Sequence, residues 1–173
     1  AIVTFGGLFK NSETCNTLGF TKNAGEVASH IKALEPLNEN TDYGLGLKAA
    51  LDVVKGQAEG RNTVVVFLSD GAPTANGSGD QDGTKAAAEI KALNIPIYGV
   101  LHSPTAAQHD KALGKMRAVC GENTVYESTD TKTFGEAMNA AFAAVYGDNT
   151  VTIPVNAAEF DMSDLELSAG TAE

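Results

Sequence analysis

Asp70 is the residue best placed to do chemistry in this sequence, because it follows an unbroken apolar run. Residues 64–68 are all apolar, and Ser69, Asp70 and Gly71 come directly after them. Such a run predicts a strand buried on both faces, as in the middle of a parallel sheet covered by helices. Ligands of open α/β sheets bind just outside the carboxyl ends of the strands. A carboxylate there can bind a hard cation, although an Asp-Gly pair after a strand can also be a simple turn.

Three other polar residues could contribute to a site of this kind. His102 follows a second apolar run, residues 95–101, so it either borders a ligand there or is only a solvated loop histidine. Ser69 points away from the side of the strand that carries Asp70, and we interpret it as structural. Asp42 is expected to be a solvated surface charge. No Ser–His–Asp or Cys–His arrangement has supporting context, and we predict that the chain is not an enzyme.

Composition narrows the classes of partner. The chain has 173 residues, enough for one domain with an ordinary core. Its net charge of −10 argues against nucleic acid and anionic membrane surfaces as partners. That charge suits a secreted or surface protein that binds hard cations, or it serves solubility alone. No apolar run is long enough to cross a bilayer. Because the sequence opens inside an apparent strand, we expect it to be a piece of a longer protein.

The polar residues are positioned by strands and helices that alternate along the chain. This alternation predicts a doubly wound, mainly parallel α/β sheet with helices on both faces and one antiparallel edge hairpin. We expect a domain over residues 1–147, followed by a trailing strand and acidic segment, 148–173, that leads to or from a neighbouring domain. Asp82 or Thr84 is expected to cap a helix. The expected strands are 1–5, 17–21, 64–68, 95–101 and 124–127, and the expected helices are 24–34, 43–58, 84–93, 105–119 and 133–145.

Three local signatures, in this order, resemble the von Willebrand factor type A family, which includes the integrin inserted domain. They are the opening AIVTFGG, the segment NTDYGLGL at 40–47 and the segment VVVFLSDGAP at 64–73. The resemblance covers about residues 1–147 and implies the Rossmann-like fold of that family. It also implies a metal-ion-dependent adhesion site at which Thr41 supplies a hydroxyl and Asp70 a carboxylate. The implied cation is Mg²⁺, or Ca²⁺ or Mn²⁺, with a coordination position open to a carboxylate of the partner.

By this resemblance, the chain is an adhesive or ligand-binding domain of a larger surface protein, of the pilus-tip or adhesin kind. The implied partner is a protein or an extracellular-matrix ligand, and the implied location is extracellular or at the cell surface. One alternative is a structural surface or pilus subunit with a vestigial metal site. Another is a Mg²⁺-dependent aspartyl-phosphate phosphatase, but such enzymes show a second acid where this chain has Ala72.

The family's first strand, which ends in Asp-x-Ser-x-Ser, has no counterpart in this sequence. Its place in the family is between the strands expected at 1–5 and 64–68, and its motif supplies three metal-site side chains. We therefore expect metal affinity to be weak or absent in this chain. A neighbouring domain or chain is expected to supply the missing strand, in preference to residues 151–155. Asp161-Met162-Ser163 resembles the motif most, and a circular permutation that uses it is the alternative.

Two further expectations concern the cysteines and the last helix. Cys15 and Cys120 are expected at opposite edges of the sheet, too far apart for a disulfide, which needs Cα atoms within about 7 Å. Residues 134–145 are expected to pack through an apolar face with few polar anchors. By resemblance, this helix shifts along the sheet when the metal site engages a ligand.

Overall fold

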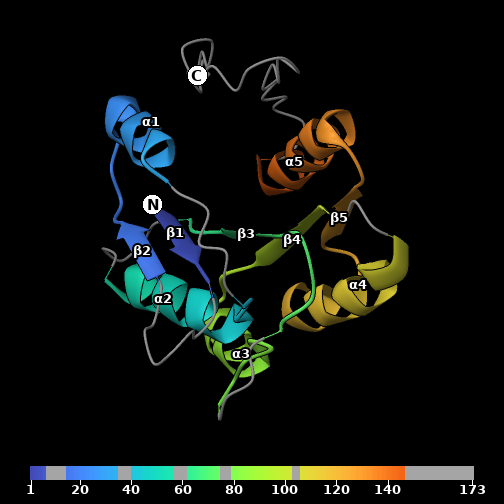
Figure 1. The fold of residues 1–173 in the computed structure, drawn as a ribbon. Helices are drawn as coiled ribbons and strands as arrows, with labels where there is room; N and C mark the ends of the chain where they lie inside the picture. The colour runs from blue at the N-terminus through green and yellow to red at the C-terminus, as the bar shows by residue number, and fades with distance from the viewer. Residues whose placement is uncertain (7–14, 35–39, 57–61, 75–78, 103–105, 147–173) are drawn as a thin grey trace.

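The computed structural model describes residues 1–6, 15–34, 40–56, 62–74, 79–102 and 106–146. Strands lie between two layers of helices, with α1 and α5 on one side and α2, α3 and α4 on the other (Figure 1). The elements in chain order are β1 (Ile2–Phe5), β2 (Cys15–Leu18), α1 (Ala24–Lys32), α2 (Tyr43–Lys55), β3 (Val65–Ser69), α3 (Thr84–Ala92), β4 (Ile97–His102), α4 (Ala106–Cys120), β5 (Val125–Ser128) and α5 (Thr131–Tyr146).

The strands form two separate sheets. β1 pairs with β2 antiparallel, with Phe5 opposite Cys15, whereas β3, β4 and β5 form a parallel sheet in which Ser69 lies opposite Leu101. The predicted α/β class, with a parallel sheet and one antiparallel hairpin, is confirmed. The second strand was expected at 17–21 but lies earlier, because its pairing with β1 begins at Cys15. Within the described residues, no ladder joins β1 to β3.

The core forms on both faces of β4. Ile97 and Leu101 face the cluster built with α2, α3 and α4, while Val100 faces α5, as the two-residue period of a strand dictates. Gly99 allows the closest approach of α4, since a Cβ atom there would lie 2.9 Å from the sulfur of Met116. β4 is therefore the strand buried on both faces.

β3 is less buried than its apolar sequence predicts. Only Phe67 is buried in it, and Leu68 is 39% exposed. The prediction that both faces of this strand are buried is wrong, since Leu68 is exposed. Among the described residues, β3 also has no strand paired with its edge away from β4. An apolar run shows that a strand is suited to burial on both faces, and β3 is buried only in part.

The amino terminus of α3 is capped by an unexpected residue. The helix begins at Thr84, and Gly83 occupies the cap position with φ of 75°. The carboxylate of Asp80 accepts hydrogen bonds from two amides of the first turn, at 2.7 and 2.9 Å. The prediction of Asp82 or Thr84 as the cap is wrong, because the turn at Gly83 brings Asp80 back over the helix end. Asp82 lies before the cap position, where its Oδ1 accepts the Thr84 hydroxyl at 3.0 Å and, at 3.5 Å, the Thr84 amide.

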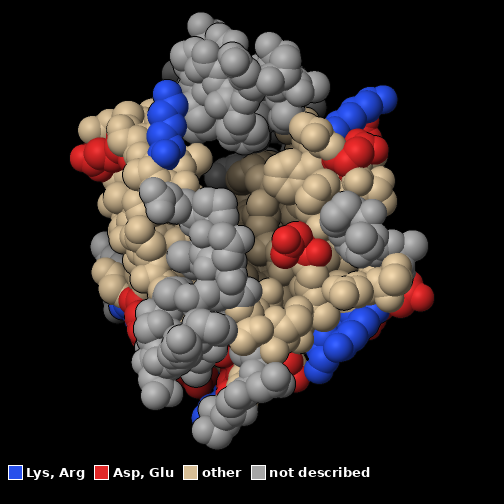
Figure 2. All heavy atoms as spheres, viewed as in Figure 1, with Lys and Arg blue, Asp and Glu red and all other residues tan. Residues whose placement is uncertain are grey.

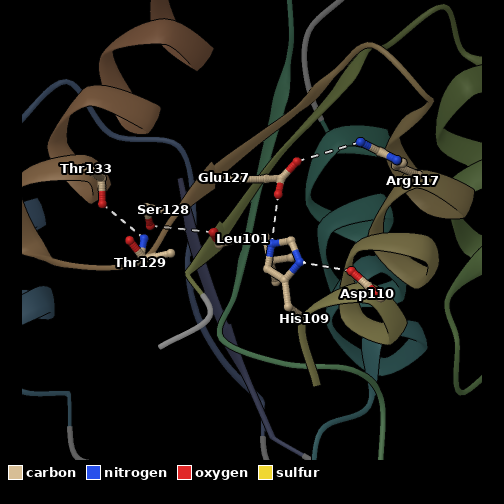
Figure 3. Close-up of polar contacts among 8 residues, drawn as sticks. All are labelled: Leu101, His109, Asp110, Arg117, Glu127, Ser128, Thr129 and Thr133. Carbon is tan, nitrogen blue, oxygen red and sulfur yellow. Dashed lines mark hydrogen bonds and ion pairs between the residues drawn. The ribbon is translucent and has the colours of Figure 1, made fainter. Parts of the chain in front are cut away.

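Polar contacts tie α4 to β5 on the side away from the hairpin. Figure 3 shows Glu127 of β5 between two side chains of α4. The carboxylate of Glu127 lies 2.8 Å from Nε2 of His109 and 3.7 Å from the guanidinium of Arg117. This surface ion pairing orients α4 over the sheet edge, although each such exposed pair stabilises by at most about 1 kcal/mol.

α5 packs through an apolar face but is held at both ends by polar contacts. Near its start, Asp130 accepts the Thr133 amide at 2.8 Å, and these hydrogen bonds lower the pKa of Asp130 below its usual range. Near its end, the Tyr98 hydroxyl donates to the Ala144 carbonyl at 3.3 Å. The expectation of few polar anchors therefore holds for the middle of the helix and fails at its ends. The ligand-linked shift of this helix stays a prediction.

Candidate ligand-binding rim

The loop after β3 presents Asp70 to solvent. The hydroxyl of Ser69 donates to the Gly71 carbonyl at 3.0 Å and accepts the Gly71 amide at 3.4 Å. These bonds fold the chain around Asp70, whose own side chain is exposed at the carboxyl end of the strand. Ser69 thus shapes the loop, in agreement with its interpretation as a structural residue.

Thr41 reaches the same rim because its loop is joined to the one that follows Asp70. The Thr41 amide donates to the Thr74 hydroxyl at 2.9 Å, and the Thr74 amide donates to the Thr41 carbonyl at 2.9 Å. Thr41 and Asp70 both line the end of the groove between β1 and β3. The structure therefore brings together these two sequence-predicted residues, which stand one helix apart in the chain.

Asp42 and Tyr43 hold this arrangement in place, and the sequence interpretation missed both. Asp42 is only 7% exposed, and its Oδ1 accepts the Leu45 amide at 3.0 Å as the amino-terminal cap of α2. The expectation of a solvated charge at Asp42 is wrong, since a carboxylate at a helix start is stabilised by the helix dipole and free amides. An aspartate directly before the apolar run of α2 was a usable signal for this cap.

Tyr43 links the start of α2 to the loop that carries Asp70. Its side chain is fully buried, and its hydroxyl donates to the Gly71 carbonyl just beyond Asp70. Burial raises the pKa of Tyr43 to about 12, so the phenol stays protonated and keeps donating at neutral pH. The ring also meets Phe67 edge-on, with centroids 4.8 Å apart. No sequence signal distinguishes this tyrosine from an ordinary core aromatic residue.

His102 stands at the same rim but faces the other way. It is one residue beyond the Ser69–Leu101 pair, so its backbone lies beside Asp70 on the neighbouring strand. Its Nδ1 lies 2.9 Å from the hydroxyl of Ser128, and its ring meets Phe134 edge-on at 5.5 Å. His102 is therefore a half-buried strand residue that contacts β5 and α5, rather than a solvated loop histidine.

The two rim residues offer the kind of ligand atom that a hard cation prefers, but they offer too few of them. Thr41 and Asp70 offer oxygen atoms, which Mg²⁺ and Ca²⁺ prefer, but these cations take six or more ligands. Across the described residues, no group of three or more His, Cys, Asp or Glu side chains could hold a metal ion. Two side chains alone do not make a high-affinity site.

The sequence model of the von Willebrand factor type A domain matches residues 1–140. This chain belongs to that family. A search of curated proteins found no significant match by sequence. None of the helices in the described part of this von Willebrand A domain is long and apolar enough to cross a membrane.

Solved structures with the same fold come from two kinds of extracellular protein. The pilus adhesin SpaC from Lactobacillus rhamnosus GG is 13% identical, with a TM-score of 0.64, and the match covers 83% of this chain and 24% of SpaC. Proximal thread matrix protein 1 from the mussel byssus is 16% identical, with a TM-score of 0.58, over 83% of this chain and 35% of that protein. One structure of the byssus protein has a zinc-occupied MIDAS motif. This von Willebrand A domain thus spans a quarter to a third of the length of these chains.

Proposed function

We propose that this von Willebrand A domain is an adhesive, non-enzymatic module of a larger extracellular or cell-surface protein. The observation that carries the proposal is the rim at which Thr41 and Asp70 come together on two hydrogen-bonded loops. That rim lies where ligands of α/β sheets bind. The similarity in fold to a pilus adhesin and a byssus matrix protein supports the same assignment.

The proposed ligand is a protein or an extracellular-matrix component that offers a carboxylate. The domain would engage it through a divalent cation, Mg²⁺ or in its place Ca²⁺ or Mn²⁺, held by Asp70 and Thr41. Because two oxygen donors are too few, tight metal binding needs further donors from outside the described residues. The net charge of −10 also favours attraction of cations over direct attraction of a ligand carboxylate. His102 would border the ligand through its backbone, which lies beside Asp70 on the neighbouring strand.

Two alternatives use the same rim differently. A structural surface subunit with a vestigial site would bind neither metal nor ligand there. An aspartyl-phosphate phosphatase would use Asp70 as a nucleophile and needs an acid two residues later, where Ala72 is 6% exposed and packed in the core. Ala72 therefore offers neither the charge nor the access that such chemistry requires.

The test combines a metal titration with a substitution at the rim. Mn²⁺ is added to the ¹⁵N-labelled chain, and we expect it to broaden the backbone NMR signals of Thr41 and Asp70 selectively. Asp70→Asn should abolish this broadening, whereas Asp52→Asn, at an exposed site on α2, should leave it unchanged. Broadening that is absent, or is spread over all acidic surfaces, would favour the vestigial site.

Adhesion and turnover are then measured on the same proteins. Beads coated with the chain are tested on immobilised extracellular-matrix proteins in Mg²⁺ and in EDTA, and we expect retention that needs both Mg²⁺ and Asp70. Retention that ignores both would assign the domain a structural role. Mg²⁺-dependent hydrolysis of p-nitrophenyl phosphate that Asp70→Asn abolishes would establish the enzyme instead.

A further inference from the structure

The charges of this chain are unevenly distributed along its sequence. Residues 147–173 contain six acidic and no basic residues, and so account for more than half of the net charge of −10. In the space-filling view, basic side chains on the visible face lie in small separate groups near the outline of the molecule, beside acidic ones (Figure 2). A strongly acidic stretch is attracted most to basic side chains that have no acidic partner of their own.

A groove of about 440 Å³ lies between α2 and α3, on the opposite side of the sheet from α5 (Figure 1). At one end the backbone of Gly44 meets the Asp80 carbonyl, since a Cβ atom at Gly44 would lie 1.7 Å from its oxygen. At the other end Lys55 lies 3.6 Å from Glu89. We call the space between these ends the α2–α3 groove. It follows α2 for about three turns, roughly 17 Å at the helical rise of 1.5 Å per residue.

Two lysines on opposite walls of the α2–α3 groove have no acidic partner in the described part of the chain. Lys48 of α2 and Lys85 of α3 are both exposed, and neither forms an ion pair with a described residue. The carboxylates of Asp42 and Asp80 line the same groove but already accept backbone amides of α2 and α3. The groove thus presents two unpaired ammonium groups against the exposed carboxylate of Asp52.

The bottom of the α2–α3 groove is apolar. Leu51 and Ala86, which line it, are 4% and 7% exposed. Toward the Gly44 end, the side-chain nitrogen of Gln81 is buried and meets no hydrogen-bond acceptor among the described residues. Side chains of an extended peptide point alternately to two opposite faces. The groove therefore suits a peptide with apolar residues on the face toward the helices and acidic residues on the other.

The acidic tail contains a stretch with this alternation. Residues 159–162 read Glu-Phe-Asp-Met, which places two carboxylates on one face of an extended segment and two large apolar side chains on the other. Four extended residues span about 13 Å, which fits within the length of the groove.

We propose that the α2–α3 groove is the docking site for residues 159–162 of the same chain. Phe160 and Met162 cover the apolar bottom. The carboxylates of Glu159 and Asp161 pair with the two unpaired lysines on the walls. The proposal is independent of metal binding and adhesion at the rim, because Thr41 and Asp70 do not line this groove.

The position of α5 lets the tail reach this groove. The Tyr98 hydroxyl donates to the Ala144 carbonyl, so α5 ends near the start of β4. α3 also ends there, because only four residues separate Ala92 from the first residue of β4. The Glu89 end of the groove and the end of α5 therefore lie at the same edge of the sheet. The residues 147–158 can span up to about 40 Å, whereas the helix layers on the two sides of a sheet are about 20 Å apart.

The test places a nitroxide spin label on the intact ¹⁵N-labelled chain at Ser163→Cys, with Cys15→Ser to keep the label at one position. Ser163 directly follows the proposed contact residues. We expect the label to broaden the amide NMR signals of Lys48, Lys85 and Ala86 more than those of Gly114, an exposed residue of α4. In 0.5 M NaCl this broadening should fall, because salt screens exposed charges.

A pair of double variants locates the contact. Lys48→Glu with Lys85→Glu should lower the docked population about tenfold, since it removes two exposed ion pairs. Lys91→Glu with Lys111→Glu makes the same change in net charge at exposed positions outside the groove and should leave the broadening unchanged. Circular dichroism checks that both variants fold. If the groove variant does not fold, the salt dependence of the spin-labelled chain without these lysine substitutions decides the question.

Three results would overturn the proposal. The first is a label that broadens no signals of α2 or α3 more than that of Gly114. The second is an equal effect of the two double variants, which would show attraction to net charge and not to the groove. The third is broadening of α2 and α3 when ¹⁵N-labelled chain without spin label is mixed with spin-labelled chain without ¹⁵N, because the tail would then bind another copy.

Discussion

Gly44→Ala should destabilise this domain, although alanine is the better helix former. Gly44 lies in the first turn of α2, where intrinsic helix propensity favours alanine over glycine by about 1 kcal/mol. A Cβ atom at Gly44 would lie 1.7 Å from the carbonyl oxygen of Asp80 and 2.7 Å from its carbonyl carbon. Both atoms belong to the backbone, so no side-chain rotation relieves the clash.

The size of the effect follows from the contacts that must open. Ordinary van der Waals contact needs about 3.5 Å, so the segment around Asp80 must move by about 2 Å. That segment is held by the Tyr43 amide, which donates to Gln81 at 3.1 Å, and by the Gly83 amide, which donates to Asp80 at 3.0 Å. Overpacking costs about 2 kcal/mol, and loss of two such hydrogen bonds costs about another 2 kcal/mol. After the gain in propensity, we expect a net loss of about 3 kcal/mol.

The assay is urea unfolding followed by circular dichroism, with Gly114→Ala as the matched control. Gly114 is an exposed residue of α4, and nothing lies within 4 Å of a Cβ atom placed there. Gly114→Ala should therefore raise the free energy of unfolding by up to about 1 kcal/mol. If Gly44→Ala is as stable as the unmodified chain while the control gains stability, the contact between α2 and Asp80 is not the constraint described here.

Two buried groups give further predictions. Cys120 is 5% exposed, and burial raises its pKa to about 12. Ellman's reagent should therefore modify the exposed Cys15 at once and Cys120 only as fast as the domain unfolds. Rapid modification of both thiols would contradict this prediction. Burial raises the pKa of Tyr43 to about 12, above its unfolded value near 10, so its protonated form stabilises the fold fully below pH 10 and this contribution is lost as the pH rises through 12. Unfolding free energies measured from pH 9 to 12 should fall more steeply for the unmodified chain than for Tyr43→Phe, and equal slopes would refute the assignment.

The fold class was predictable because the apolar runs have distinct lengths and surroundings. The run 95–101 was correctly predicted to be a buried strand, and the structure places Ile97, Val100 and Leu101 at 1% exposure or less. The run 64–68 is also apolar, yet Leu68 is 39% exposed, and among the described residues no strand pairs with β3 on the side away from β4. An apolar composition shows what a strand can bury, whereas the segment that covers it depends on contacts between parts of the chain that are distant in sequence.

The candidate site was predictable only where residue type and strand position coincide. Asp70 was located from the apolar run before it, and Thr41 only through the family resemblance. The residues that position them, Tyr43 and Thr74, act through a buried hydroxyl and through paired loops. Such contacts depend on three-dimensional proximity between segments about 30 residues apart, which periodicity and spacing do not report.

The division into two sheets also bears on how the chain emerges from the ribosome. β3, β4 and β5 are consecutive in the sequence and can pair as each becomes available, with α4 and α5 closing over them. The hairpin of β1 and β2 is synthesised first, but the residues that pack against Phe5, namely Tyr43 and Phe67, come roughly 40 and 60 residues later. During that interval the nascent hairpin keeps an apolar edge open to other chains. Translation speed and chaperone access while residues 1–70 emerge should therefore influence the folding of this domain more than they do while residues 71–146 emerge.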